Sequence, residues 1–177
     1  MKQSNKTRTM VMAAMFLSIA FVLPFLTGQV PQIGAMLCPM HLPVILCGFL
    51  CGAPWGALVG FLAPILRSLI LGMPPMFPKA ICMAVELAVY GVVAGSFYKK
   101  LPKKKMNIYV SLIVAMITGR VVWGIAMGLC MGIRGEAFGM EAFIAGAVTN
   151  AIPGILIQIL LIPVLVMAME QVKNKEK

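Results

Sequence analysis

The sequence is poor in acidic and catalytic side chains. Its 177 residues include no aspartate, five acidic residues in all and a single histidine. The lack of aspartate excludes aspartate-based metal clusters and the aspartate motifs of membrane phosphotransferases. A lone histidine without a suitably spaced serine motif argues against an intramembrane hydrolase. A Gly-rich phosphate loop ending in Lys-Ser or Lys-Thr is also missing, so the chain does not hydrolyse ATP through that loop. We therefore expect neither enzymatic activity nor a cofactor.

Charge is missing from a long part of the chain. Between Thr9 and Leu66 there is no Asp, Glu, Lys or Arg, and 61% of all residues are hydrophobic. A water-soluble domain of this size cannot bury so much apolar surface. The apolar runs also lack the alternating pattern of a membrane barrel, and only helices satisfy their own backbone hydrogen bonds in lipid. The sequence thus predicts an all-α integral membrane protein.

The cysteines show no pattern typical of a disulfide framework or a zinc site. No CxxC pair occurs, and all five cysteines lie within or near apolar runs, which favours a role in packing. Cys38 and His41 have CxxH spacing, but a metal site needs a second cluster, so no metal is expected. The five are Cys38, Cys47, Cys51, Cys82 and Cys130.

Positive charge gathers in three places, and the net charge is +10. One group precedes the first apolar run, one separates two runs and one follows the last. The positive-inside rule places all three groups, and with them both termini, in the cytoplasm; it also disfavours nucleic acid as the partner. They are Lys2, Lys6 and Arg8; Lys99, Lys100, Lys103, Lys104 and Lys105; and Lys173, Lys175 and Lys177.

Three cytoplasmic groups require an even number of crossings on each side of the middle one. We therefore expect a single membrane domain, 1–177, with six transmembrane helices. The second and third are joined only by Gly52-Ala53-Pro54, so they form a tight pair. The predicted spans cover about 10–26, 33–51, 55–71, 79–98, 107–133 and 142–169.

The first span carries a face of small residues. Ala14 and Ser18 stand four residues apart, with Ala13 and Ala20 nearby. Such a face lets another helix approach closely. Docking of a partner and ordinary packing within the chain both remain open interpretations.

Two ionisable residues lie deep in the predicted membrane region, where each costs roughly 2.5 to 3.5 kcal/mol to insert. Counted from the outer helix ends, Glu86 lies ~12 Å deep, Asn150 ~14 Å and Arg120 between ~12 and ~20 Å. Tyr90 shares a helix face with Glu86, and Trp123 shares one with Arg120. Together these groups offer more hydrogen bonds than one ion pair uses, which favours a ligand site; a structural Glu86–Arg120 pair is the alternative.

Two further polar residues are ambiguous. Arg67 is near the outer end of its helix, where it either snorkels to the interface or contributes to a site. His41 is either a hydrogen-bonded packing residue or a ligand.

Three stretches of the chain carry a family resemblance. They are IGAMLCPMHLPVILCGFLCGAPWGALVGFLAPILRSLILGMPP, FPKAICMAVELAVYGVVAGSFYK and AGAVTNAIPGILIQILLIPVLVM. The chain resembles the substrate-binding S components of energy-coupling factor (ECF) vitamin transporters, in the group that includes the riboflavin and pantothenate components. The resemblance implies a six-helix protein of the bacterial cell membrane that captures a small vitamin-like molecule. It also implies a transmembrane coupling subunit and two ABC-type ATPases as partners.

The resemblance also assigns roles to residues. The family's Ala-x-x-x-Ala docking face matches Ala14 and Ser18, with Ser in place of the second Ala. Its ligand site is built from the first loop and helices four to six, which hold Gln29, Glu86, Arg120, Trp123 and Asn150. The Met-His start of the nickel and cobalt branch is missing, which disfavours metal transport.

Candidate substrates are pantothenate or a pyridoxine- or pyrimidine-like precursor. The alternative function is a stand-alone secondary permease that uses Glu86 as a proton carrier.

Overall fold

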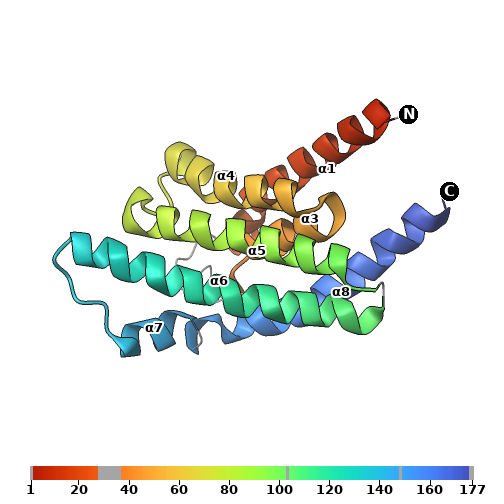
Figure 1. The fold of residues 1–177 in the computed structure, drawn as a ribbon. Helices are drawn as coiled ribbons and strands as arrows, with labels where there is room; N and C mark the ends of the chain where they lie inside the picture. The colour runs from red at the N-terminus through yellow and green to blue at the C-terminus, as the bar shows by residue number, and fades with distance from the viewer. Residues whose placement is uncertain (1, 28–36, 103, 148, 176–177) are drawn as a thin grey trace.

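The computed structural model describes residues 2–27, 37–102, 104–147 and 149–175. These residues form helices and no strand (Figure 1), which confirms the prediction of an all-α fold. In chain order the elements are α1 (Lys2–Val22), η1 (Leu23–Thr27), α3 (His41–Cys51), α4 (Ala53–Leu71), η2 (Met76–Ala80), α5 (Ile81–Lys100), α6 (Lys105–Ile133), α7 (Met140–Ala147), η3 (Thr149–Ala151) and α8 (Ile152–Lys175).

Five helical stretches within the described residues are long and apolar enough to cross a membrane. They are Lys6–Phe25, Ala53–Leu71, Met76–Lys100, Lys105–Ile133 and Met140–Gln171. The apolar helix α3 has 11 residues, so it extends only ~16 Å. It occupies the second half of the predicted span 33–51, and residues 33–36 lie outside the described part.

The last predicted span, 142–169, lies within the apolar stretch Met140–Gln171, but its described residues are divided among three elements. Instead of one continuous helix, the structure has α7, the short η3 and then α8. The division falls next to Pro153, the second residue of α8. Proline lacks a backbone N–H and its ring clashes with the carbonyl four residues earlier, so it is tolerated in the first turn of a helix and interrupts a longer one.

Glycines bring α3, α4 and α5 into backbone contact. A Cβ atom added to Gly56 of α4 would lie 2.7 Å from the Cα of Gly48 in α3 and 2.9 Å from the Cα of Gly91 in α5. Small residues at such crossings let apolar helices pack closely where lipid supplies no hydrophobic driving force. This contact sets α5 between the α3–α4 pair and α6 (Figure 1).

The chain ends lie at one end of the bundle. Figure 1 shows the N-terminus of α1, the C-terminus of α8 and the turn between α5 and α6 on the same side. The described members of the three groups of positive residues therefore lie at one end of the bundle. The opposite end holds the connections from α4 to α5 and from α6 to α7.

Candidate substrate-binding site

A buried ion pair links α5 to α6. Nη1 of Arg120 lies 3.1 Å from Oε1 of Glu86, and the two side chains are 15% and 1% exposed. Oε1 has no aligned hydrogen bond among the described residues, so we treat this approach as a contact between charges. The structure thus brings together the two ionisable residues that the sequence placed at one depth.

Tyr90 and His41 complete the surroundings of the Glu86 carboxylate. Tyr90 follows Glu86 by one helical turn and is 1% exposed, so its phenol is buried close to that carboxylate. His41 begins α3; its Nε2 lies 3.5 Å from Oε1 of Glu86, and its ring meets the Tyr90 ring edge-on at 5.2 Å. A Cβ atom on Gly119 would lie 3.0 Å from the Tyr90 ring. The missing side chain therefore lets Tyr90 sit against α6.

Cys38 is the member that sequence reasoning missed. Nη2 of Arg120 donates a hydrogen bond to its Sγ at 3.4 Å. Cys38 precedes α3 and has a positive φ of 47°. The two residues of the CxxH spacing both belong to this site: Cys38 contacts the guanidinium of Arg120, and His41 lies near the carboxylate of Glu86. We call Cys38, His41, Glu86, Tyr90 and Arg120 the polar cluster.

The polar cluster has hydrogen-bonding capacity in reserve. Arginine offers five N–H groups, and Nε of Arg120 is buried with no hydrogen-bond partner in the described part of the chain. Nδ1 of His41 is buried in the same condition. A buried polar group left unpaired costs about 1 to 3 kcal/mol. A ligand that satisfied these atoms would recover that free energy.

Trp123 follows Arg120 by one helical turn, and its ring contacts two other aromatic rings; its role in the site remains a prediction. Its ring meets the Phe138 ring edge-on at 6.1 Å and stacks on the Phe143 ring at 6.4 Å. Trp123 therefore packs against α7 and the segment before it, as part of a separate aromatic group.

Gln29 and Asn150 were also predicted to line the site. Gln29 lies outside the described residues. The backbone of Asn150 lies in η3, but its side chain is outside the described part. Their roles remain predictions.

Arg67 is held inside the protein and does not snorkel to the interface. It is 5% exposed, and its Nη1 donates to the backbone oxygen of Phe21 at 2.8 Å. Its guanidinium also lies 5.1 Å from the centre of the Phe25 ring. A carbonyl in the last turn of a helix needs a hydrogen-bond donor from outside the helix. The face of an aromatic ring also attracts a cation electrostatically. Arg67 thus ties α4 to the end of α1.

Ala14 and Ser18 both face outward on α1, whereas Ala13 and Ala20 are buried. The Ser18 hydroxyl donates to the backbone oxygen of Ala14 at 3.0 Å. The hydroxyl is therefore satisfied within its own helix, and the exposed face stays small.

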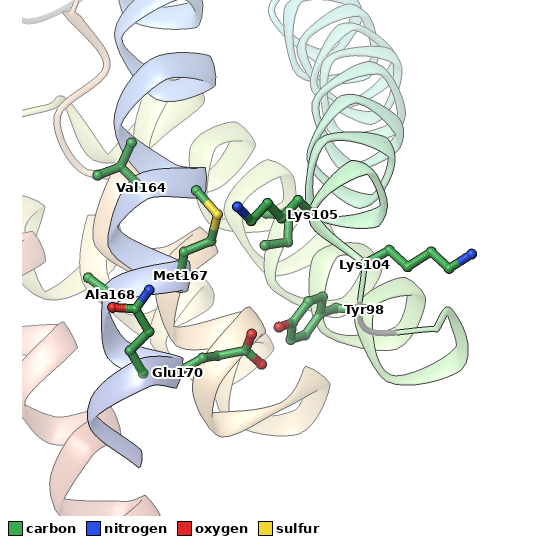
Figure 2. Close-up of a pocket in the computed structure, with 9 residues that line it drawn as sticks. Tyr98, Lys104, Lys105, Val164, Met167, Ala168 and Glu170 are labelled. Carbon is green, nitrogen blue, oxygen red and sulfur yellow. The ribbon is translucent and has the colours of Figure 1, made fainter. Parts of the chain in front are cut away.

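A separate cavity of about 470 Å³ lies at the other end of α5, between α8 and the start of α6. Figure 2 shows the Tyr98 hydroxyl facing the Glu170 carboxylate, the Lys105 ammonium directed toward α8 and the Lys104 ammonium directed away from it. This cavity shares no residue with the polar cluster. Its lining comprises Tyr98, Lys104, Lys105, Ile108, Val164, Met167, Ala168, Glu170 and Gln171.

The comparisons with known proteins agree with the helical membrane architecture. The family model described as "ECF transporter, substrate-specific component" matches residues 8–166. Among curated proteins and solved structures, no significant match was found. The match spans most of the chain, from α1 through most of α8. The chain, a multi-pass membrane protein, therefore belongs to the family of ECF transporter substrate-specific components.

Proposed function

We propose that this chain is the high-affinity capture subunit of an ATP-driven importer for a vitamin or related micronutrient, and that the polar cluster binds the substrate. The proposal rests on the burial and the unsatisfied hydrogen bonding of the Arg120 side chain. Its guanidinium is charged, largely buried and in contact with Glu86, yet its Nε has no partner among the described residues. A structural ion pair alone leaves that cost unexplained.

The donors and acceptors of the cluster suggest the chemistry of the substrate. The planar fork of arginine fits a carboxylate or phosphate. Glu86 accepts hydrogen bonds from hydroxyl or amine groups, and the rings of His41 and Tyr90 add apolar surface. Pantothenate, with one carboxylate, hydroxyls and an amide, suits this set. A pyridoxine- or pyrimidine-like precursor would depend more on Glu86 and the rings.

Other subunits would supply the energy for transport and couple it to this chain. The chain has no phosphate-binding loop, so we assign ATP hydrolysis to two ABC-type ATPases joined through a transmembrane coupling subunit. The outward-facing Ala14 and Ser18 on α1 suit close contact with that subunit. In the bacterial cytoplasmic membrane, the end bearing the termini and the Lys-rich turn would face the cytoplasm.

A ligand screen tests the binding site. Purified protein is screened by thermal shift against the B vitamins and their precursors, and the best ligand is titrated on Arg120→Gln and Glu86→Gln. If that ligand is an anion, Arg120→Gln should weaken it by more than about 1.4 kcal/mol, a factor of ten. Lys104→Gln, which removes an exposed charge far from the cluster, is the matched control. Unchanged affinity in both cluster variants would reduce Glu86–Arg120 to a structural pair.

Docking of the coupling subunit on α1 is tested in a separate experiment that measures substrate uptake. Ala14→Trp should abolish uptake and leave ligand binding near normal, because helix contact fails while the cluster is untouched. Ile117→Trp, at a 62% exposed position on α6, controls for added bulk. Normal uptake by Ala14→Trp would contradict docking and favour the stand-alone permease.

A further inference from the structure

Two cysteines meet across the contact between α5 and α6. The Sγ atoms of Cys82 and Cys130 lie 3.7 Å apart. Cys82 is in the first turn of α5 and fully buried, while Cys130 is in the last turn of α6 and partly exposed. A disulfide needs a sulfur separation of about 2.05 Å. A small movement of the two side chains would close the gap.

This pair differs from the other three cysteines. Cys47 and Cys51 interact with each other, but both lie on α3, one turn apart. Cys38 accepts the hydrogen bond from Arg120. Cys82 and Cys130, by contrast, are on two different helices, and their sulfur atoms meet between them.

We propose that Cys82 and Cys130 are a site of reversible thiol–disulfide modification that covalently joins the start of α5 to the end of α6. Cys82 lies one helical turn before Glu86, so the bond would fix the spacing of the two helices next to the Glu86–Arg120 contact. In the proposed orientation the pair lies near the outer end of the bundle, where disulfide oxidants have access.

The reaction requires a disulfide oxidant, RSSR. Cys130 reacts first because it is the more accessible thiol: its thiolate attacks one sulfur of RSSR, forms a mixed disulfide and releases RS⁻, which takes up the proton lost by Cys130. The Cys82 thiolate then attacks the Cys130 sulfur and displaces the second RS⁻, which takes up the Cys82 proton. In sum, two protein thiols and RSSR give one Cys82–Cys130 disulfide and two RSH.

The test is oxidation of the purified full-length chain with dithiodipyridine, a small aromatic disulfide. Free thiols are then blocked with N-ethylmaleimide, and the bond is located by peptide mass mapping. We expect a Cys82–Cys130 disulfide as the main product, reversed by dithiothreitol. Cys130→Ser should abolish it, and the Cys47→Ala/Cys51→Ala double variant should retain it. Both thiols free after oxidation, or equal yields of several pairings, would overturn the proposal.

Stability gives a second readout. A cross-link restricts the unfolded chain, so oxidation should raise the Tm of the wild-type protein by several degrees and leave that of Cys130→Ser unchanged. Cys130 is partly exposed, and its serine variant is the one expected to fold. An equal Tm shift in both proteins would show that oxidation acts elsewhere, which contradicts the assignment.

Discussion

Helix α5 contributes to two polar regions that differ in how deeply their polar groups are buried. The polar cluster near its start holds a carboxylate, a guanidinium, an imidazole and a phenol almost completely inside the bundle. The cavity at its other end, ~18 Å along the helix from Glu86, places Tyr98 beside Glu170 and close to the Lys-rich turn. Each region pairs a tyrosine of α5 with a carboxylate.

The difference lies in what surrounds each pair. Lysine ammonium groups at the cavity can remain hydrated at the end of the helices, so a lost contact can be replaced by water. The cluster lies between α3, α5 and α6, where an unpaired charge has no such replacement. The same chemical change should therefore cost far more in the cluster than at the cavity.

The largest expected effect follows removal of the Glu86 carboxylate. Glu86→Ala leaves the Arg120 charge buried without its counter-charge, and we expect a loss of about 3 to 5 kcal/mol in the free energy of unfolding. Glu170→Ala at the cavity should cost less than about 1 kcal/mol, since Glu170 is partly exposed and water can replace its contacts. Unfolding in detergent, followed by thermal or denaturant melts, measures both. Equal losses in the two variants would contradict the distinction between the two regions. If Glu86→Ala does not fold, Glu86→Gln replaces it in the same measurement.

A matched pair of tyrosine substitutions sharpens the comparison. Tyr90→Phe removes a buried hydroxyl close to the Glu86 carboxylate, which should cost about 1.5 to 3 kcal/mol because the neighbouring group is charged. Tyr98→Phe makes the same change beside Glu170, where we expect less than about 1 kcal/mol. The two variants are compared in the same melts. A larger loss for Tyr98→Phe would contradict our account of the cluster.

The third prediction concerns the geometry of the cluster's cation. Arg120→Lys keeps the charge but loses the planar fork, so an anionic ligand should bind about tenfold more weakly. Lys105→Arg, the reverse change at the cavity, should leave affinity unaltered. Isothermal titration with the best ligand of the vitamin screen measures both. Full affinity in Arg120→Lys would mean that charge alone is recognised.

The smallest effect on stability is expected for two cysteine substitutions that test the orientation of the chain in the membrane. In a cysteine-free background, Lys104→Cys should react with an impermeant maleimide only from the cytoplasmic side, and Glu136→Cys only from outside. Both positions are exposed, so stability should change little. Labelling of Lys104→Cys in intact cells would invert the topology and exchange the sides assigned to the cluster and the cavity.

Local sequence predicted the helical membrane fold well, because apolar runs without charge leave few alternatives in lipid. It also placed Glu86 and Arg120 at compatible depths, since rise per residue is constant along a helix. Local sequence did not resolve the break before α8, where Pro153 follows a polar Thr-Asn pair inside an otherwise apolar run. Such prolines both begin helices and kink them, and the neighbouring packing decides which.

By itself, the sequence determined which segments are apolar helices, which face of α1 is small and which side chains had to find partners inside the bundle. Only the tertiary structure decided which side chains those partners are. Glu86 lies between Arg120 and His41, whereas Trp123 packs against α7. Helical periodicity says which residues share a face, but the rotation of that face depends on close contacts such as those of Gly56 and Gly119, which involve residues far apart in the chain.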